Sequence, residues 1–188
     1  MAKRPLFLDR DGVINKRLKG DYVRYPHQFV FENRALDALR TLAELFYPII
    51  VVSNQAGVGK GLIALEDVEV VHQYMLSKVE DAGGRIDKVY FCPHHPEEGC
   101  LCRKPALGMA YRAQCDFPEL IFEEAWMVGD SLSDMQMGSS LGMRTALILG
   151  KEEEAALLEA FPVARRFHSL WDFAVYCRAE ASSSSENC

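Results

Sequence analysis

Residues 7–15 read Phe-Leu-Asp-Arg-Asp-Gly-Val-Ile-Asn, a short apolar run that stops at two aspartates. Such a run is typical of a buried strand, and the reactive groups of an open α/β sheet collect just past the carboxyl ends of its central strands. Asp9 and Asp11 would lie at such an end. Two carboxylates at this spacing repel each other unless a cation neutralises them, and Mg²⁺ suits carboxylate oxygens. Taken alone, the motif is also compatible with an acidic turn that caps a strand.

A second apolar run ends in the same way, because residues 128–134 read Val-Gly-Asp-Ser-Leu-Ser-Asp. The two stretches together place four acidic side chains at the ends of two strands. At this point the chain resembles the haloacid dehalogenase superfamily of phosphohydrolases. In that superfamily an Asp-x-Asp, a Ser or Thr, a Lys and a Gly-Asp-x-x-x-Asp follow one another. All four motifs occur here in that order, at Asp9 and Asp11, Ser53, Lys104, and Asp130 and Asp134.

Length and charge favour one domain that acts on a small molecule. A chain of 188 residues can bury roughly 70% of its unfolded surface, so we expect one domain over 1–181 and a disordered tail at 182–188. The net charge of −6 and the absence of a long basic run argue against nucleic acid or membrane partners and favour a monomer with a small substrate. Asp9 interrupts the first apolar run too early for a signal peptide or a membrane span, which predicts a cytoplasmic protein.

Strand-like and helix-like segments alternate along the chain. Apolar runs predict strands at 49–52, 89–91, 125–128 and 145–149. Helical spacing and end signals predict helices from a cap at Asn33 to Leu45, and at 65–81, 108–115 and 152–160. This alternation predicts an α/β fold, with helices on both faces of a Rossmann-like, doubly wound parallel sheet, as in the haloacid dehalogenase superfamily, and no large cap domain.

Two segments next to the predicted site have no regular period. Residues 16–27 carry several basic side chains, so they form either a loop over the site or a simple solvated connection. Residues 56–61, Ala-Gly-Val-Gly-Lys-Gly, lack the Gly-Lys-Ser/Thr ending of a nucleotide phosphate loop, which excludes ATP binding. Their backbone N–H groups are expected to approach an anion beside Ser53. His72 and Met75 are interpreted as ordinary helix-face residues.

Residues 92–102 read Cys-Pro-His-His-Pro-Glu-Glu-Gly-Cys-Leu-Cys. Three thiolates and an imidazole in one short loop suit a tetrahedral Zn²⁺, and a closed shell of four ligands makes such an ion structural. The uneven spread of the six cysteines argues against a disulfide framework. Reduced cysteines beside an incidental histidine are the alternative. The resemblance uses Cys-x-His, which implies His94 rather than His95 and the ligand set Cys92, His94, Cys100 and Cys102.

The Cys-Arg-Lys-Pro at 102–105 narrows the resemblance to two sister families. They are the D-glycero-D-manno-heptose 1,7-bisphosphate 7-phosphatases of lipopolysaccharide core and related heptose biosynthesis, and the histidinol-phosphate phosphatases of histidine biosynthesis. Residues 7–15, 22–23, 53–55 and 92–96 look closest to the heptose enzymes. The short cysteine loop is nearer in length to the histidinol enzymes, so histidinol phosphate stays the alternative substrate. A zinc-stabilised binding module without catalysis is a weaker alternative, because every catalytic position is filled.

The resemblance implies hydrolysis of a phosphate monoester through an aspartyl-phosphate. Asp9 attacks phosphorus, while Asp11 protonates the leaving oxygen and later activates water. Mg²⁺ is held by Asp9, Asp130 and the backbone carbonyl of Asp11. Ser53 and Lys104 complete the phosphoryl cradle.

Further expected roles concern the support of the site and the recognition of the substrate. Asp134 is expected to orient Lys104 or the metal shell rather than to bind the metal. Arg103 is expected to recognise the phosphate that does not react, because the planar arginine fork can bind phosphate in a bidentate way. Lys16 and Lys19 could add to this grip. The other expected substrate contacts are Arg17, Tyr22, Ser53, Asn54, Gln55 and Lys104.

Overall fold

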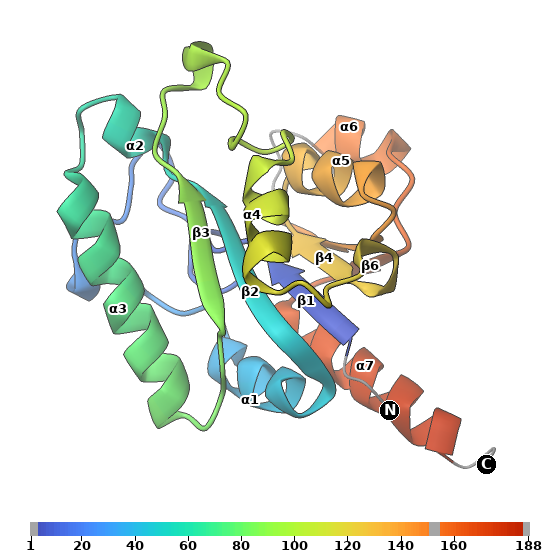
Figure 1. The fold of residues 1–188 in the computed structure, drawn as a ribbon. Helices are drawn as coiled ribbons and strands as arrows, with labels where there is room; N and C mark the ends of the chain where they lie inside the picture. The colour runs from blue at the N-terminus through green and yellow to red at the C-terminus, as the bar shows by residue number, and fades with distance from the viewer. Residues whose placement is uncertain (1–3, 151–154, 186–188) are drawn as a thin grey trace.

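The computed structural model describes residues 4–150 and 155–185, and its centre is a parallel sheet of six strands in the order β3-β2-β1-β4-β5-β6 (Figure 1). The strands are β1 (Arg4–Leu8), β2 (Phe46–Asn54), β3 (Lys88–Cys92), β4 (Trp126–Gly129), β5 (Arg144–Ile148) and β6 (Arg165–Phe167). Every neighbouring pair is parallel. The predicted doubly wound α/β sheet is confirmed, and the described residues contain no separate cap domain.

Helices cover both faces of this sheet (Figure 1). The α-helices are α1 (Ala35–Leu45), α2 (Ala56–Gly59), α3 (Leu65–Asp81), α4 (Gly108–Asp116), α5 (Leu132–Ser140), α6 (Ala155–Ala160) and α7 (Leu170–Ser185), with short 3-10 turns at Pro26–Gln28, Pro96–Glu98 and Phe122–Glu124. Leu6 and Leu8 of β1 pack into the core under α1, α3 and α7, whereas Phe7 packs into the core under α4 and α5. Because side chains alternate across a strand, a strand covered on both faces is apolar at every position.

The register of the central strands sets the functional edge of the sheet. Leu8 of β1 lies opposite Val51 of β2 and Val128 of β4, and the Asp9 N–H donates to the Val128 carbonyl at 2.9 Å. The three strands therefore end at nearly the same level. The chain leaves β1 toward β2 on one side and returns to β4 on the other, and such a switch point leaves a crevice beyond the carboxyl ends of the strands.

Most predicted elements match, but the start of α1 differs. The helix over 65–81 is confirmed as α3. The predicted cap at Asn33 is wrong, because α1 begins at Ala35 after Arg34, which is left-handed (φ 58°) and makes no capping hydrogen bond with its side chain. The Arg34 guanidinium instead lies 3.6 Å from the centroid of the Trp171 ring. A tertiary contact with α7 takes the place of a local cap.

The C-terminal part of the chain was under-predicted. The three-residue strand β6 and the helix α7 were not among the predicted elements. Because α7 continues to Ser185, the tail expected to be disordered from residue 182 is helical over its first four residues, and 186–188 lie outside the described residues. Residues 152–154 of the predicted helix over 152–160 also lie outside them. Among the helices that the structure describes, none combines the length and the apolar character needed to cross a membrane.

Candidate active site

A cavity of about 1150 Å³ opens at the carboxyl edge of β1, β2 and β4. The residues that follow these strands line its floor, and the loop over 16–23 lines one side. The alternative that this loop is only a solvated connection is therefore wrong. Four of the predicted site residues on this lining are Asp9, Ser53, Lys104 and Asp130.

Lys104 bridges two aspartates at the floor of the cavity. Its Nζ atom lies 2.7 Å from Asp9 Oδ1 and 2.6 Å from Asp134 Oδ1, and it donates to the Val52 carbonyl at 2.7 Å. Burial raises the pKa of Asp9 to about 6, with the Asp134 and Asp11 charges adding to this effect and Lys104 opposing it. Burial disfavours the charged form of Lys104, yet the carboxylates of Asp134 and Asp9 raise its pKa. Lys104 therefore stays protonated and orients the Asp9 carboxylate.

Asp11 is held by donors on both of its oxygens. Arg10 donates from Nη2 to Oδ1 at 3.0 Å and from Nε to Oδ2 at 3.1 Å. Asn15 Nδ2 donates to Oδ1, and Gln55 Nε2 to Oδ2, each at 2.9 Å. Burial acts to raise the pKa of Asp11, but the charge and hydrogen bonds of Arg10, followed by those of Asn15 and Gln55, bring it below its usual value. The Asp11 carboxylate is thus anchored in its ionised form.

Arg10 and His72 form a buried pair that the sequence analysis missed. Arg10 is 1% exposed and His72 on α3 is 4% exposed. Arg10 Nη1 donates to His72 Nε2 at 3.0 Å. His72 is therefore not the ordinary helix-face residue that its position in the apolar pattern of α3 suggested, because it contacts the residue between Asp9 and Asp11. A histidine in an apolar helical stripe is a weak signal for such a role.

Arg17 lies against the acidic end of β4. Its Nη2 atom donates to both Asp130 carboxylate oxygens, at 2.7 and 2.8 Å, and to the backbone carbonyl of Asp11 at 3.0 Å. Burial disfavours the charged form of Arg17, but the carboxylates of Asp130, Asp9 and Asp11 raise its pKa. The predicted substrate residue Arg17 thus contacts two of the groups that the resemblance assigns to Mg²⁺.

The same acids are suited to a divalent cation. One carboxylate oxygen each from Asp9, Asp130 and Asp134 lies within 4.8 Å of the others, and a donor set made only of oxygen fits Mg²⁺. Asp134 already has partners, since its Oδ2 accepts from Ser131 N at 3.1 Å and from Ser131 Oγ at 2.6 Å. Its other oxygen contacts Lys104. The expectation that Asp134 orients Lys104 agrees with these contacts.

Gly12 allows Asp130 to reach this site. Its φ of 93° is in the region that favours glycine, and a Cβ at this position would lie 2.0 Å from Asp130 Oδ2. The glycine in Asp-x-Asp-Gly is therefore required by the close approach of the β4 end to the β1 end.

The end of β2 braces the site. Ser53 is 1% exposed and accepts from Gln55 Nε2 at 2.7 Å. Asn54 pairs with the backbone of Lys104, donating from Nδ2 to its carbonyl at 3.1 Å and accepting from its N–H at 3.0 Å. Asn54 and Gln55 therefore hold Lys104 and Asp11 in place, and their predicted contact with substrate stays a prediction.

The glycine-rich stretch has a packing role that the sequence analysis did not foresee. Residues 56–59 form the short helix α2. A Cβ on Gly59 would lie 2.1 Å from the backbone nitrogen of His95, and the Gly59 N–H donates to the Pro93 carbonyl at 2.7 Å. Gly59 thus lets the cysteine loop pack against α2.

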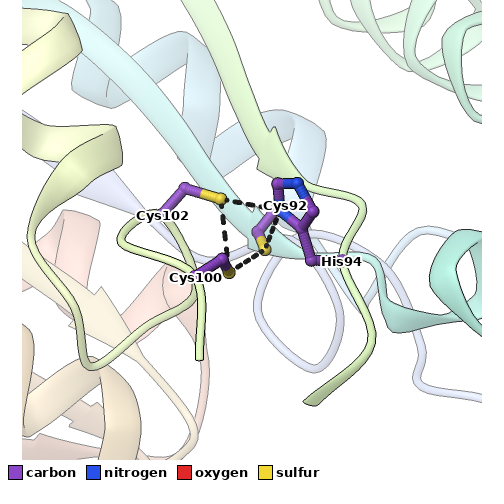
Figure 2. Close-up of side chains that lie close together, drawn as sticks. All are labelled: Cys92, His94, Cys100 and Cys102. Carbon is purple, nitrogen blue, oxygen red and sulfur yellow. Dashed lines mark hydrogen bonds between the residues drawn. The ribbon is translucent and has the colours of Figure 1, made fainter. Parts of the chain in front are cut away.

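The cysteine loop brings four side chains into one cluster (Figure 2). The Cys100 sulfur lies 3.5 Å from that of Cys92 and 3.6 Å from that of Cys102, and His94 Nδ1 lies 3.5 and 3.1 Å from the Cys92 and Cys102 sulfurs. Ligands bonded to Zn²⁺ at about 2.3 Å in a tetrahedron would be separated by roughly 3.8 Å. His95 is outside the cluster, and its Nδ1 accepts from the Glu97 N–H.

Arg103 follows this cluster and lines the cavity. Its Nη1 atom is buried and has no hydrogen-bond partner in the described part of the chain. Tyr22, Lys16 and Lys19 also line the cavity. The predicted recognition residues therefore surround the same space as the acids.

The parallel sheet, together with the aspartates that follow β1 and β4, is typical of a haloacid dehalogenase-like hydrolase. In agreement, the HAD-hydrolase-like family matches residues 101–173. D-glycero-alpha-D-manno-heptose-1,7-bisphosphate 7-phosphatase of Mycobacterium tuberculosis is 38% identical over 174 residues, which cover 90% of this chain and 89% of its own length. D-glycero-beta-D-manno-heptose-1,7-bisphosphate 7-phosphatase of Neisseria meningitidis is 32% identical over 185 residues, which cover 93% of this chain and 95% of its own length. The chain therefore belongs to the heptose-1,7-bisphosphate 7-phosphatase family.

A solved structure agrees with this placement. The D,D-heptose 1,7-bisphosphate phosphatase from B. bronchiseptica, complexed with magnesium and phosphate, superposes with a TM-score of 0.86 and 27% identity. The similarity covers 94% of this chain and 99% of that one. The fold is thus shared over nearly the whole chain.

Proposed function

We propose that this chain is a Mg²⁺-dependent phosphomonoester hydrolase that removes the 7-phosphate of D-glycero-D-manno-heptose 1,7-bisphosphate. The observation that carries the proposal is the Asp9 carboxylate, which lies at the floor of the cavity with one oxygen 2.7 Å from Lys104 Nζ. A buried carboxylate oriented by a lysine, with a second carboxylate two residues away, is the arrangement that covalent phosphoryl transfer requires. The names of the relatives supply the heptose substrate.

In the first half of the reaction, an Asp9 oxygen forms a bond to the phosphorus of the 7-phosphate while the bond from phosphorus to the C7 oxygen breaks. Asp11 gives its proton to that oxygen, and heptose 1-phosphate leaves. The low pKa of Asp11 means that its protonated form must be favoured when substrate binds. The negative charge of an arriving phosphate has this effect.

In the second half, the ionised Asp11 takes a proton from water as the water oxygen attacks the phosphorus of the aspartyl-phosphate. The bond between phosphorus and Asp9 breaks, and inorganic phosphate leaves. The four donors on Asp11 favour the ionised form that this step needs. Lys104 and Ser53 donate to phosphoryl oxygens throughout.

Asp9, Asp130 and the backbone carbonyl of Asp11 would hold Mg²⁺. When bound, the ion would offset the charge of the attacking carboxylate and of the phosphoryl oxygens. The fit rests on the oxygen donor set and on the Arg17 guanidinium, which shows that a positive group is accommodated between Asp130 and the Asp11 carbonyl.

Arg103 would bind the phosphate that does not react. Arg103 directly precedes Lys104 in the sequence, and both residues line the cavity. The Arg103 Nη1 atom has no partner among the described residues. A bisphosphate could therefore span from the floor of the cavity to Arg103. Tyr22, Lys16 and Lys19 on the facing loop would contact the sugar and its second phosphate.

We further propose that Cys92, His94, Cys100 and Cys102 bind a structural Zn²⁺. The four donor atoms lie within 4.8 Å of one another, and a closed set of three sulfurs and one nitrogen suits zinc. The ion would fix the loop that leads into Arg103 and Lys104.

A substrate panel tests the function. Phosphate release in Mg²⁺ is measured for both anomers of the heptose bisphosphate, for histidinol phosphate and for p-nitrophenyl phosphate, and ³¹P NMR identifies the position that is cleaved. We expect the highest kcat/KM for one heptose anomer, with heptose 1-phosphate as product. Preference for histidinol phosphate would replace the proposed substrate, and no release from any ester would favour a non-catalytic binding module.

A further inference from the structure

The three nitrogen atoms of the Arg10 guanidinium group contact two different residues. Nε and Nη2 donate to the two oxygens of Asp11, while Nη1 donates to His72 on α3. With 1% of its surface exposed, the guanidinium is almost completely removed from water. A buried guanidinium needs a partner for each donor, because an unsatisfied charged donor costs more than a neutral one.

His72 must accept this hydrogen bond as a neutral imidazole. Arginine is a donor only, so His72 Nε2 carries no proton and the proton of the neutral ring resides on Nδ1. Burial, together with the neighbouring Arg10 charge, lowers the pKa of His72 to about 3, which agrees with a ring that stays neutral. His72 also packs edge-on against Phe91 of β3, with ring centroids 5.2 Å apart.

The helix that carries His72 stands outside the cavity. Val68, Val71, Met75 and Val79 of α3 are buried residues, and His72 is not among the residues that line the cavity over the described ranges. Phe29, on the other side, lies 5.9 Å from the Arg10 guanidinium, measured to the ring centroid. Packing against α3 and Phe29 thus leaves the guanidinium little room to turn.

We propose that His72 is a positioning residue for the reaction: it fixes the Arg10 guanidinium, and Arg10 in turn fixes the Asp11 carboxylate beside Asp9. The inference rests on the proposed function, because Asp11 is the proposed acid and base. His72 acts through Arg10, which contacts the Asp11 carboxylate directly.

Loss of the acceptor has a defined consequence. Without His72 Nε2, the buried Nη1 of Arg10 has no partner. The guanidinium then lowers its free energy by rotating toward another acceptor. Rotation breaks the paired contacts of Nε and Nη2 with Asp11. Asn15 and Gln55 each hold a single Asp11 oxygen, so the carboxylate would remain bound but misoriented. The binding of substrate phosphates would be little affected.

The first experiment compares His72→Leu with His72→Gln. Leucine removes the acceptor at similar volume, whereas the Gln carbonyl oxygen can reach the position of Nε2. We expect kcat of His72→Leu to fall about tenfold or more, the scale for a buried donor left unsatisfied, with KM within about twofold. His72→Gln should recover most of the lost rate.

Val71→Ala is the matched control. Val71 precedes His72 and is fully buried in the core under α3, so its truncation loosens the packing of α3 but leaves the Arg10 contact. Its kcat should stay near the wild-type value although its melting temperature falls. Equal kcat losses in Val71→Ala and His72→Leu, or no recovery in His72→Gln, would overturn the proposal.

The leaving group provides a second kinetic readout. p-Nitrophenolate leaves without a proton, so the first half of the reaction needs no acid, whereas the second half still needs Asp11 as base. His72→Leu should therefore keep a rapid burst of p-nitrophenol and lose steady-state rate. A burst reduced as much as the steady state would mean that His72 acts on the Asp9 step instead.

NMR separates a failure of this inference from a failure of the proposed function. In wild-type protein at neutral pH, the His72 imidazole should be neutral with its proton on Nδ1, and Arg10→Lys should change its ¹⁵N shifts. This measurement needs no catalytic activity. If these signals appear but no phosphate ester is cleaved, the function fails and the Arg10–His72 pair stands; a proton on Nε2 would overturn the pair itself.

Discussion

The aspartate cavity and the cysteine loop are both clusters of candidate metal ligands, yet they are built in opposite ways. Asp9 and Asp130 come from distant parts of the chain and meet because β1 and β4 end at one level, and Lys104 joins them from the loop after β3, where its backbone pairs with Asn54 at the end of β2. The cysteine ligands lie within eleven residues, from Cys92 to Cys102, in a loop with one 3-10 turn.

Their charge balance differs as well. In the cavity the aspartates after β1 and β4 have positive partners from the chain, with Arg10 on Asp11, Arg17 on Asp130 and Lys104 on Asp9. In the cysteine loop, burial together with the neighbouring Cys102 and Cys100 raises the pKa of Cys92 to about 12. We therefore expect the cavity to keep its shape without a metal, whereas the cysteine loop would depend on the proposed Zn²⁺ to hold its thiolates together.

Asp9→Asn should give the largest loss of activity and the smallest loss of structure. Removal of the attacking charge should lower kcat by on the order of a thousandfold or more. Because burial raises the pKa of Asp9 to about 6, ionised Asp9 opposes folding at neutral pH, and the amide should leave the melting temperature equal or higher. Thermal unfolding measures the melting temperature, and steady-state kinetics measure kcat. Asp37→Asn, at a side chain that is 42% exposed, is the control. A protein that unfolds would mean that the cavity depends on Asp9 as a structural group.

Cys102→Ser should show the reverse pattern. Zinc content should fall from about one ion per chain to near zero, since structural zinc is bound with roughly 10 kcal/mol or more. Hydrogen exchange should rise over 92–104, and little in β1 or β4. Elemental analysis and hydrogen exchange test this, with the exposed Cys115→Ser as control. Zinc-free wild-type protein with a protected loop would contradict the zinc assignment.

The two regions also differ in how far the sequence alone predicted them. The clustering of Cys92, Cys100 and Cys102 could be predicted from local spacing, whereas the choice of His94 over His95 rested on the family resemblance. The acidic ends of β1 and β4 were predictable because an apolar run that stops at aspartates marks the carboxyl edge of a parallel sheet. Helix α3 was predictable from its regular apolar spacing.

The contacts that hold the acids were not predictable. Arg10, Arg17 and His72 acquire their roles only when the loop over 16–23 and α3 pack against the ends of the strands. The sequence pattern of α3 is the same whether His72 faces an arginine or other core residues. The short edge strand β6 and the start of α1 at Arg34 were missed for the same reason, since tertiary contacts rather than local signals determine them.

Stability in acid should depend on His72. Burial, with help from Arg10, lowers the pKa of His72 from 6.5 to about 3, so between these values the unfolded chain binds a proton that the native state does not. Stability from this residue is complete above pH 6.5 and falls as the pH drops, by about 1.4 kcal/mol per pH unit. Urea unfolding at pH 7 and pH 5 should show a smaller decrease for His72→Gln than for wild type.

The control for this measurement is His27→Gln, which changes an exposed histidine. The cysteine loop would also lose its proposed Zn²⁺ in acid, but it would do so in all three proteins, so the difference isolates His72. Identical pH dependence in wild type and His72→Gln would contradict a neutral buried imidazole.

Arg103→Ala should discriminate between substrates. Loss of one charge-assisted phosphate contact should lower kcat/KM for the heptose bisphosphate by roughly tenfold to a hundredfold, or about 1.5–3 kcal/mol. p-Nitrophenyl phosphate has no second phosphate and should lose much less. Arg112→Ala on α4 is a control that removes an exposed arginine outside the cavity lining. Equal losses on both substrates would mean that Arg103 serves the reacting phosphate.

Arg17→Gln should give the smallest of these effects, a change in the affinity of the cavity for Mg²⁺. Arg17 Nη2 contacts Asp130 and the Asp11 carbonyl, the same groups proposed to hold Mg²⁺, so the cation and the guanidinium compete for them. Because Arg17 is 39% exposed, solvent weakens this ion pair, and the expected gain in Mg²⁺ affinity is about fivefold. Isothermal titration calorimetry measures it, with Lys19→Gln making the same change in net charge on the same loop. Weaker Mg²⁺ binding in Arg17→Gln than in Lys19→Gln would show that Arg17 orients Asp130 for the metal instead of competing with it.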